Sequence, residues 1–344
     1  MRERTEIGAV IALVAGALST GGAGMLVRLT ETGPTATAFW RGLLALPLLA
    51  IWALLDSRDG AAASRDTGEA GRQNAPVATG ANLPAATSAS RPSAGMARVL
   101  SAWREPGFLL AGVYFAGDLA LWNWSLLLTS VAASTLEASL APLLVILFAW
   151  LRWQERPSAR FLGATVLAFV GLLLMLSPKF GQQGSAFLGD ALGLGTACFF
   201  AAYLVAIARL RARYSTGVVM FYSTLVFTVL LLPLALTQKF FPDDLSGWAA
   251  LAGCAVAAHT LGQGLIAYAL AHLRPTFSSL GLLLQTLGAA ASAWLVLGER
   301  LAALQIIGAL VIVGALTLAR TARNATAAVA ATPVPPSLGG VVRD

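Results

Sequence analysis

The sequence predicts an all-α integral membrane protein whose ten transmembrane helices form two inverted-topology repeats of five helices each. Three observations support this prediction: the scarcity of charged residues, the number of long apolar stretches, and a repeated sequence pattern. Of the 344 residues, 57% are hydrophobic and only 11% are charged, whereas soluble domains carry about 25% charged residues. The charged residues are too few to cover the surface of a soluble protein of this size. Soluble classes of protein are therefore excluded.

Apolar stretches long enough to cross a bilayer, about 20 residues, recur ten times along the chain. The first follows Met1-Arg2-Glu3-Arg4 and so resembles a signal peptide, but its length and the nine later stretches predict a retained helix. The ten stretches cover residues 7–27, 35–55, 107–128, 130–151, 159–178, 186–208, 217–236, 247–271, 275–297 and 302–319.

The positions of the basic residues predict how the helices are oriented. If the N-terminus is cytoplasmic, most of the 23 Lys and Arg residues fall in cytoplasmic loops or tails. Only Arg28, Lys179, Lys239 and Arg300 fall on the opposite side, and Arg41 lies within a span. Cytoplasmic loops of membrane proteins carry an excess of Lys and Arg, so both termini are expected in the cytoplasm. The net charge of +7 therefore indicates orientation rather than binding to nucleic acid.

Two segments differ in composition from the spans. Residues 56–106 are rich in Ala, Ser, Gly, Pro and Arg without apolar periodicity, and such a composition cannot bury enough surface to fold. We expect a disordered cytoplasmic insertion there and a disordered cytoplasmic tail at 321–344. Residues 1–178, which include the insertion, then form the first five-helix repeat, and residues 179–320 form the second.

An internal repeat relates the two halves. Residues 149–156 (AWLRWQER) recur as residues 293–300 (AWLVLGER) at a shift of 144, and Arg28-Leu29 matches Arg209-Leu210 at a shift of 181. Because each unit holds an odd number of helices, the second enters the membrane from the opposite side. Inverted repeats around a site near the bilayer midplane are typical of secondary transporters.

These features resemble the EamA-type, ten-helix branch of the drug/metabolite transporter superfamily. The resemblance extends over residues 7–55, 107–178 and 186–319. It is carried by Trp40-Arg41-Gly42, by Ala133-Ser134-Thr135 through Pro142-Leu143, and by the Glu-Arg steps at 155–156 and 299–300. It implies a multi-pass permease of the bacterial inner membrane, commonly an exporter of amino acids, metabolites or drugs. Thr286 stands where a proline would match Pro142, so the sequence offers no proline-based reason for a bend in the ninth helix.

Three charged residues, Arg41, Asp118 and Glu137, lie deep inside spans, where ionisable groups are costly and indicate functional positions. Arg41 and Glu137 each lie roughly 9–11 Å from the outer ends of their helices at 1.5 Å per residue. Equal depth and opposite charge suggest an ion pair facing the bundle interior. The pair could lock the two helices together, or it could open to bind a substrate carboxylate or amine.

Small and polar residues form a stripe on each of two predicted helices that occupy equivalent places in the repeats. The two stripes could line a cavity, or they could allow close packing of the helices through small residues. The fourth helix carries Ser130, Ser134, Glu137 and Ala141, and the ninth carries Ser278, Gly281, Gln285, Gly288 and Ser292.

Asp118 and His259 both lie near the middle of their spans. Trp122 shares the helix face of Asp118, and Gln263 follows His259 by one turn. A buried carboxylate at this depth can carry a proton. A lone histidine in an apolar helix can instead be a hydrogen-bonded structural residue.

We therefore expect a central substrate cavity. Glu137 and Asp118 are candidates for proton coupling or for binding a substrate amine, and Arg41 for binding a carboxylate. The expected partners are a small-molecule substrate, a coupling proton and the lipid bilayer, with the protein a monomer or homodimer. Neither a cofactor nor a metal is expected, because the isolated Cys198 and Cys254 form no ligand cluster. The cavity is predicted to be lined by Arg41, Asp118, Trp122, Glu137, His259, Gln263 and Gln285.

An intramembrane enzyme using Asp118, Glu137 and His259 is the competing class. Phe115-Ala116-Gly117-Asp118 lacks the first glycine of the Gly-x-Gly-Asp motif of intramembrane aspartyl proteases. Neither a His-Glu-x-x-His motif, a nucleophile elbow nor a phosphate loop occurs in the sequence. The sequence therefore favours a transporter over an enzyme.

Overall fold

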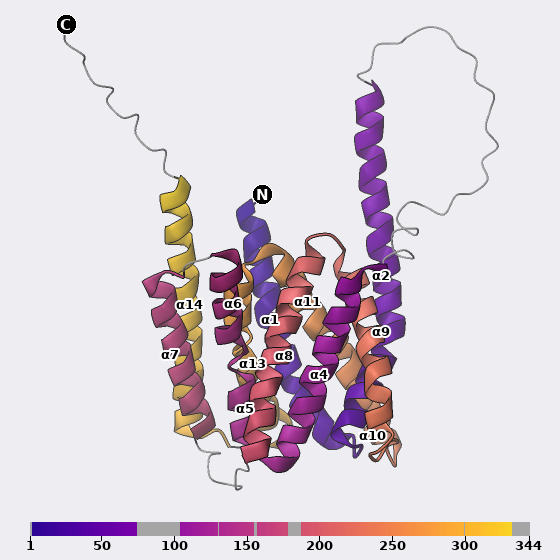
Figure 1. Cartoon of the computed structure of the whole chain (residues 1–344), viewed down its shortest axis with the longest axis vertical. Coiled ribbons are helices and arrows are strands. Elements are labelled where there is room, and N and C mark those ends of the chain that lie inside the picture. The colour runs from indigo at the N-terminus through magenta and orange to yellow at the C-terminus, as the bar shows by residue number, and fades with distance from the viewer. Residues whose placement is uncertain are drawn as a thin grey trace, which may run out of the picture.

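A computed structural model describes residues 2–73, 104–129, 131–154, 157–177, 187–298 and 300–331. Within these ranges all regular secondary structure is helical, and the helices stand side by side in one bundle (Figure 1). Nine helical stretches of the described ranges are long and apolar enough to cross a membrane. The fold is therefore that of a multi-pass membrane protein.

The helices divide between the two halves of the chain. The first half of the chain contributes α1 (Arg2–Leu29), α2 (Pro34–Gln73), α4 (Pro106–Leu128), α5 (Val131–Ala138), α6 (Ala141–Trp153) and α7 (Ala159–Leu176). The second half contributes α8 (Phe187–Arg211), α9 (Thr216–Ala235), α10 (Leu245–Gly253), the π-helix η3 (Cys254–Gln263), α11 (Gly264–His272), α12 (Pro275–Gly281), α13 (Leu284–Leu297) and α14 (Ala303–Ala331).

Three helices differ from the predicted spans. The third predicted span, α4, is 23 residues long but is not among the nine apolar stretches, since Asp118 and Asn123 make it more polar. It nevertheless packs between α8 and α9 within the bundle (Figure 1). Helices α2 and α14 continue to Gln73 and Ala331, into the two segments expected to be disordered. The rest of those segments, 74–103 and 332–344, lies outside the described residues.

The fourth and ninth predicted helices are both interrupted. Pro142 lies in the first turn of α6, where the new helix begins after the end of α5. Between α12 and α13, in contrast, the backbone N–H groups of Leu282 and Leu283 donate over three residues, to the carbonyls of Ser279 and Leu280 (3.1 Å each). These short bonds interrupt the regular helix before α13 begins. The ninth helix is thus interrupted although the sequence has no proline there.

The eighth predicted helix contains ten residues of π-helix, Cys254–Gln263. The Thr260 hydroxyl donates to the carbonyl of Ala255, five residues earlier (2.8 Å), which matches the wider turn. Stretches of π-helix are rare and often occur at functional sites. Both candidate residues of this helix, His259 and Gln263, lie within the π-helix.

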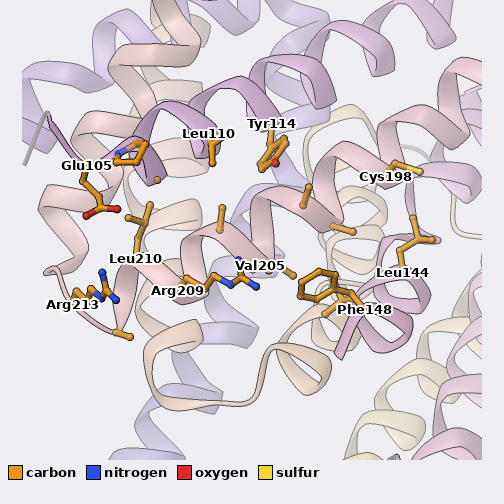
Figure 2. Close-up of a pocket in the computed structure, with 17 residues that line it drawn as sticks. Glu105, Leu110, Tyr114, Leu144, Phe148, Cys198, Val205, Arg209, Leu210 and Arg213 are labelled. Carbon is orange, nitrogen blue, oxygen red and sulfur yellow. The ribbon is translucent and has the colours of Figure 1, made fainter. Parts of the chain in front are cut away.

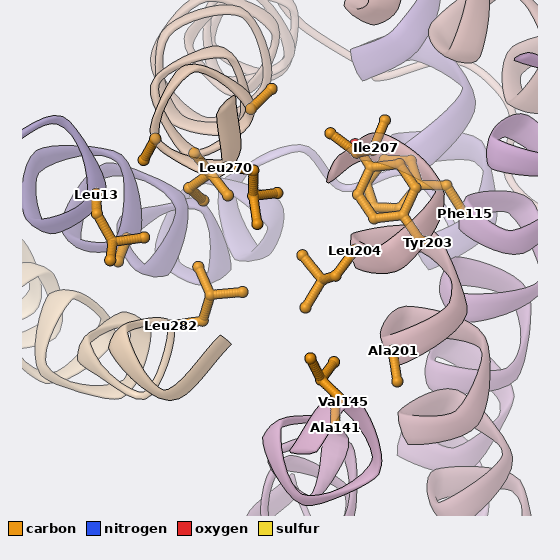
Figure 3. Packing of buried hydrophobic residues seen from close by; sticks show 14 of the residues in the cluster. Leu13, Phe115, Ala141, Val145, Ala201, Tyr203, Leu204, Ile207, Leu270 and Leu282 are labelled. Atoms are coloured by element: carbon orange, nitrogen blue, oxygen red, sulfur yellow. The ribbon is translucent and has the colours of Figure 1, made fainter. Parts of the chain in front are cut away.

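Close helix approaches and an apolar core hold these elements together. A Cβ built on Gly171 of α7 would lie 2.8 Å from the Gly308 carbonyl oxygen of α14, so the two backbones are in contact. Glycines permit such crossings in membranes, where packing rather than water exclusion drives helix association. Figure 3 shows Val145, Leu204 and Leu282 converging in the apolar interior beside the interrupted helices.

Candidate substrate site

Three of the predicted site residues gather in the interior of the bundle. Arg41 comes from α2, Asp118 from α4 and His259 from η3. Asp118 is 8% exposed and His259 is 1% exposed, and the carboxylate and guanidinium interact electrostatically. The Arg41 Cζ atom also lies 6.0 Å from the ring centroid of Phe115. The structure thus brings a cation, a carboxylate and an imidazole from three helices into one polar cluster.

The imidazole of His259 is fixed by a hydroxyl and two aromatic rings. Its Nε2 atom lies 2.7 Å from Thr224 Oγ1 of α9. The ring centroids of Phe115 and Phe227 lie 6.0 Å and 5.3 Å from the imidazole centroid. Tyr203 of α8 stacks on Phe115 at 4.4 Å. These contacts leave the ring one orientation, with Nε2 directed toward α9.

Two nitrogens of the cluster are buried without a hydrogen-bond partner, namely Arg41 Nε and His259 Nδ1. A buried polar atom without a partner costs about 1–3 kcal/mol. The cluster is therefore a place where a polar ligand group or a water gains hydrogen bonds. A guanidinium suits a carboxylate, and the Asp118 carboxylate suits an amine or a proton.

Glu137 lies apart from this cluster. Its carboxyl group lies over Gly193 of α8 and interacts with the Asp190 carboxyl group, although its Oε2 atom is buried without a hydrogen-bond partner. Asp190 in turn accepts a hydrogen bond from the Thr129 hydroxyl (2.7 Å). The expected ion pair between Arg41 and Glu137 is not present among the described residues, because α5 packs on α8 while α2 packs on α9 and η3.

The remaining predicted residues lie near the cluster along the chain but are not in described contact with it. Trp122 is half-buried on α4, one turn beyond Asp118, and Gln263 is buried at the end of η3. Gln285 begins α13 and packs its backbone against Gly21 of α1. Its Nε2 atom is buried without a hydrogen-bond partner. Whether these three residues contact substrate stays a prediction.

A cavity of about 770 Å³ lies between α4, α6 and α8 (Figure 2). Its walls are mostly apolar; Arg213 and Glu105 lie toward one of its ends, whereas Arg209 extends toward Phe148. The Arg209 Cζ atom lies 5.5 Å from the ring centroid of Phe148. Sequence reasoning missed this cavity because it treated Arg209 and Arg213 only as residues that orient the helices.

Other residues of the site could not be found by sequence reasoning either. Thr224, Phe115 and Phe227 lie in apolar runs that contain several similar residues, so nothing distinguishes them before the helices are packed. Of the two Glu-Arg steps, Glu155, Arg156 and Glu299 lie outside the described residues.

A multi-pass helical bundle with a charged cluster in its interior is the architecture of a membrane transport protein. The model of the EamA-like transporter family matches residues 90–177 and 187–321, which together form more than half of the chain. The chain belongs to the EamA-like transporter family.

Comparisons with individual proteins agree with this family. The pseudopaline exporter CntI from two strains of Pseudomonas aeruginosa is 29% identical over 226 residues, which are 65% of this chain and 78% of the relative. A solved structure described as "Crystal structure of protein" has a TM-score of 0.64 at 18% identity. It covers 94% of this chain and 98% of its own, and it supports the fold alone. The protein is thus a multi-pass membrane transporter.

Proposed function

We propose that the protein is a secondary transporter that exports a small metabolite, amino acid or drug-like solute across the bacterial inner membrane by alternating access. The observation that carries this proposal is the interior cluster of Arg41, Asp118 and His259. Three helices contribute to it, and it contains buried nitrogens without hydrogen-bond partners. Arg41 would bind a substrate carboxylate, and Asp118 would bind an amine or the coupling proton.

The direction of transport and a first cargo to test come from the relative. CntI is named as an exporter of pseudopaline, so export is the proposed direction and pseudopaline is the first compound to assay. The same relative and the family favour transport over an intramembrane enzyme that uses Asp118, Glu137 and His259. Hydrolysis of a substrate by the purified protein, abolished by Asp118→Asn, would replace this proposal with the enzyme.

We propose two inverted repeats of five helices, with both termini in the cytoplasm; the helix pairing supports the repeat, and the distribution of basic residues supports the orientation. Helix α1 packs against α12 and α13, as α8 packs against α5 and α6. Helix α2 packs against α9, and α7 packs against α14. Exchanging the first five predicted spans with the last five converts the α1 pairing into the α8 pairing and returns the α2–α9 and α7–α14 pairs to themselves. The interrupted helices, α5–α6 and α12–α13, also exchange places.

The two equivalent interfaces differ in a way that alternating access requires. At Gly21 and Gly288, a Cβ atom would overlap the backbone of Gln285 and of Leu18, so α1 and α13 are closed together. The repeat shifts of 181 and 144 place Ala202 and Leu144 at the equivalent positions, and both line the cavity. One interface is thus packed shut while its counterpart is open, which suits a carrier in one of its two states.

Proton coupling is proposed for two places. The carboxyl groups of Glu137 and Asp190 interact, and two interacting carboxyls can hold one proton between them. Asp118, beside Arg41, is the second candidate. Proton binding at either place would neutralise a charge inside the bundle and lower the electrostatic cost of a conformational change.

A flux assay in proteoliposomes tests the proposal. Pseudopaline, amino acids and cationic drugs are assayed with and without a pH gradient. Asp118→Asn and Arg41→Ala are compared with Asp243→Asn, which removes an exposed loop carboxylate. We expect at least one compound to be transported, both site variants to lose at least tenfold in rate, and Asp243→Asn to behave as wild type. Site variants that are equally incorporated and fully active would overturn the site.

A further inference from the structure

We infer that the cavity between α4, α6 and α8 binds an amphipathic organic monoanion, with Arg209 and Arg213 at its acidic group and the apolar wall around its body. Placing this ligand on the path of an exported solute rests on the proposed function. Binding itself can be measured without transport, so the two can fail separately.

The size and lining of the cavity fit a small amphipathic molecule. Its volume of about 770 Å³ lies within the range of roughly 300–1,000 Å³ that is usual for small-molecule sites. Tyr114, Leu144, Phe148 and Val205 line it, and Leu144 and Phe148 lie toward the end opposite Arg213 (Figure 2). The cavity follows α8 from Cys198 to Arg209, about 16 Å at 1.5 Å per residue.

The charges of the described residues that line the cavity favour an anion. Arg209 and Arg213 face a single carboxylate, that of Glu105, among the charged residues lining the cavity. The excess of one positive charge matches one acidic group on the ligand. The Arg209 guanidinium above the Phe148 ring, at 5.5 Å, is within the range of a cation–π contact. That contact holds the guanidinium against the apolar wall. An amphipathic anion bound there would contact the guanidinium with its acidic group and the wall with its apolar body.

The cavity lies next to the interior polar cluster. Tyr114 of α4 lines the cavity, and the following residue, Phe115, contacts His259 and stacks on Tyr203. An aromatic pair, Phe115 and Tyr203, therefore stands between the two sites. The ends of α4 and α8 that border the cavity lie at the same end of the bundle as the N-terminus (Figure 1). With the proposed orientation, the ligand reaches this cavity from the cytoplasm.

The chain carries its own reporter for binding. Cys198 is an exposed thiol that lines the cavity, whereas Cys254, the only other cysteine, is buried. The full chain in phosphatidylcholine nanodiscs is treated with a maleimide, and the rate of labelling is followed with and without dansylglycine. Dansylglycinamide, the neutral counterpart, is the control probe, and Cys198→Ser identifies the labelled thiol. Dansyl fluorescence gives a second, independent measure of binding.

We expect dansylglycine to slow labelling of Cys198 at least fivefold at saturation and its amide to leave the rate unchanged. Arg209→Gln with Arg213→Gln should weaken dansylglycine binding at least tenfold. Arg160→Gln, which removes an exposed arginine of α7 outside the cavity, should bind normally. Equal protection by acid and amide, or normal binding by the double variant, would overturn the inference.

Two further outcomes separate the alternatives. If nanodiscs with phosphatidylglycerol protect Cys198 and dansylglycine cannot compete, the cavity holds a phospholipid and the inference is wrong. Asp118→Asn, expected to stop transport, should still show protection by dansylglycine. Protection without transport of any compound by the wild type would overturn the proposed function and keep the binding site. Transport of a solute without protection of Cys198 by dansylglycine would overturn the binding site and keep the proposed function.

Discussion

Thr224 Oγ1 lies 2.7 Å from His259 Nε2 in the interior of the bundle, where a hydroxyl of α9 meets the π-helix η3. Because this bond occupies Nε2, the second ring nitrogen, Nδ1, is the one left without a partner. Whichever group donates, the hydroxyl sets the orientation of the ring. Thr224 thus positions the imidazole, and Nδ1 is the atom available to a ligand.

Thr224→Val should destabilise the protein and impair transport. Valine keeps the shape of threonine but leaves His259 Nε2 buried without a partner, which costs about 1–3 kcal/mol. Thr228→Val is the matched control, since the hydroxyl of Thr228, one turn away on α9, is buried without a hydrogen-bond partner. Thermal unfolding in detergent should show a lower melting temperature only for Thr224→Val. A lower melting temperature for both variants would assign the effect to general packing.

The charges of Arg41 and Asp118 should prove coupled. Arg41→Ala leaves a carboxylate inside the bundle without its cation, and Asp118→Asn leaves the cation without its anion. Losing one partner of a buried pair costs about 3–5 kcal/mol, whereas the double variant Arg41→Ala/Asp118→Asn contains neither charge. In a double-mutant cycle of thermal stability, the double variant should be more stable than the sum of the two losses predicts. Simple additivity would show that the two charges act independently.

Gly193→Ala should disturb Glu137 selectively. A methyl group at Gly193 would overlap Glu137 Oε2, so the carboxyl group must leave its place beside Asp190. At Gly195 on the same helix, a methyl group would lie 3.0 Å from the flexible end of Leu121. If Glu137 and Asp190 share a coupling proton, Gly193→Ala should abolish the stimulation of transport by a pH gradient, and Gly195→Ala should retain it. Equal stimulation in both variants would exclude this pair from coupling.

Much of the polar cluster could be predicted from the sequence, because an ionisable residue within an apolar run is rare and costly. Arg41, Asp118 and His259 are identified in that way, and the structure places them together. The pairing of Arg41 with Glu137 could not be judged from depth, because depth does not determine which helices are neighbours. That depends on how the glycines of each helix allow it to pack.

The bend of the ninth helix and the cavity also escaped prediction, for related reasons. The helix is interrupted at Leu282 and Leu283, whose backbone N–H groups bond over three residues, and leucine at these positions gives no sequence signal for such bonds. The cavity depends on the spacing of α4, α6 and α8, and no residue type in those helices encodes that spacing by itself. Nine of the predicted spans could be recognised from apolar length among the described residues, whereas α4, which carries Asp118 and Asn123, falls short of that criterion.

The stability of the loop before α10 should depend on pH through Asp244. Asp244 accepts hydrogen bonds from the Gly247 backbone N–H (2.8 Å) and the Ser246 hydroxyl (2.8 Å), and these bonds hold its pKa below the ordinary value. A lowered pKa stabilises the fold above the unfolded value, about 4, and this stabilisation disappears as the pH falls through the folded value. Asp244→Asn keeps a capping side chain that does not titrate. The melting temperature of the wild type minus that of Asp244→Asn should therefore decrease when the pH is lowered below about 4. A difference that stays constant down to pH 3 would contradict this.

Gly21→Ala should open the interface between α1 and α13, whereas Gly22→Ala, at the neighbouring position on α1, should leave it unchanged. A methyl group at Gly21 would overlap the backbone carbonyl of Gln285, which cannot rotate away, whereas one at Gly22 would lie 3.8 Å from Ser292 in ordinary contact. Gly21→Ala must therefore separate α1 from α13 at the closed interface. Overpacking of this kind costs about 1–3 kcal/mol, and a carrier can relieve it by opening that interface. In a Cys198→Ser background, which removes the exposed native thiol, a thiol introduced by Ser292→Cys should then react with a maleimide several times faster with Gly21→Ala than with Gly22→Ala. If both variants label at the same rate, the closed interface does not depend on the Gly21 contact.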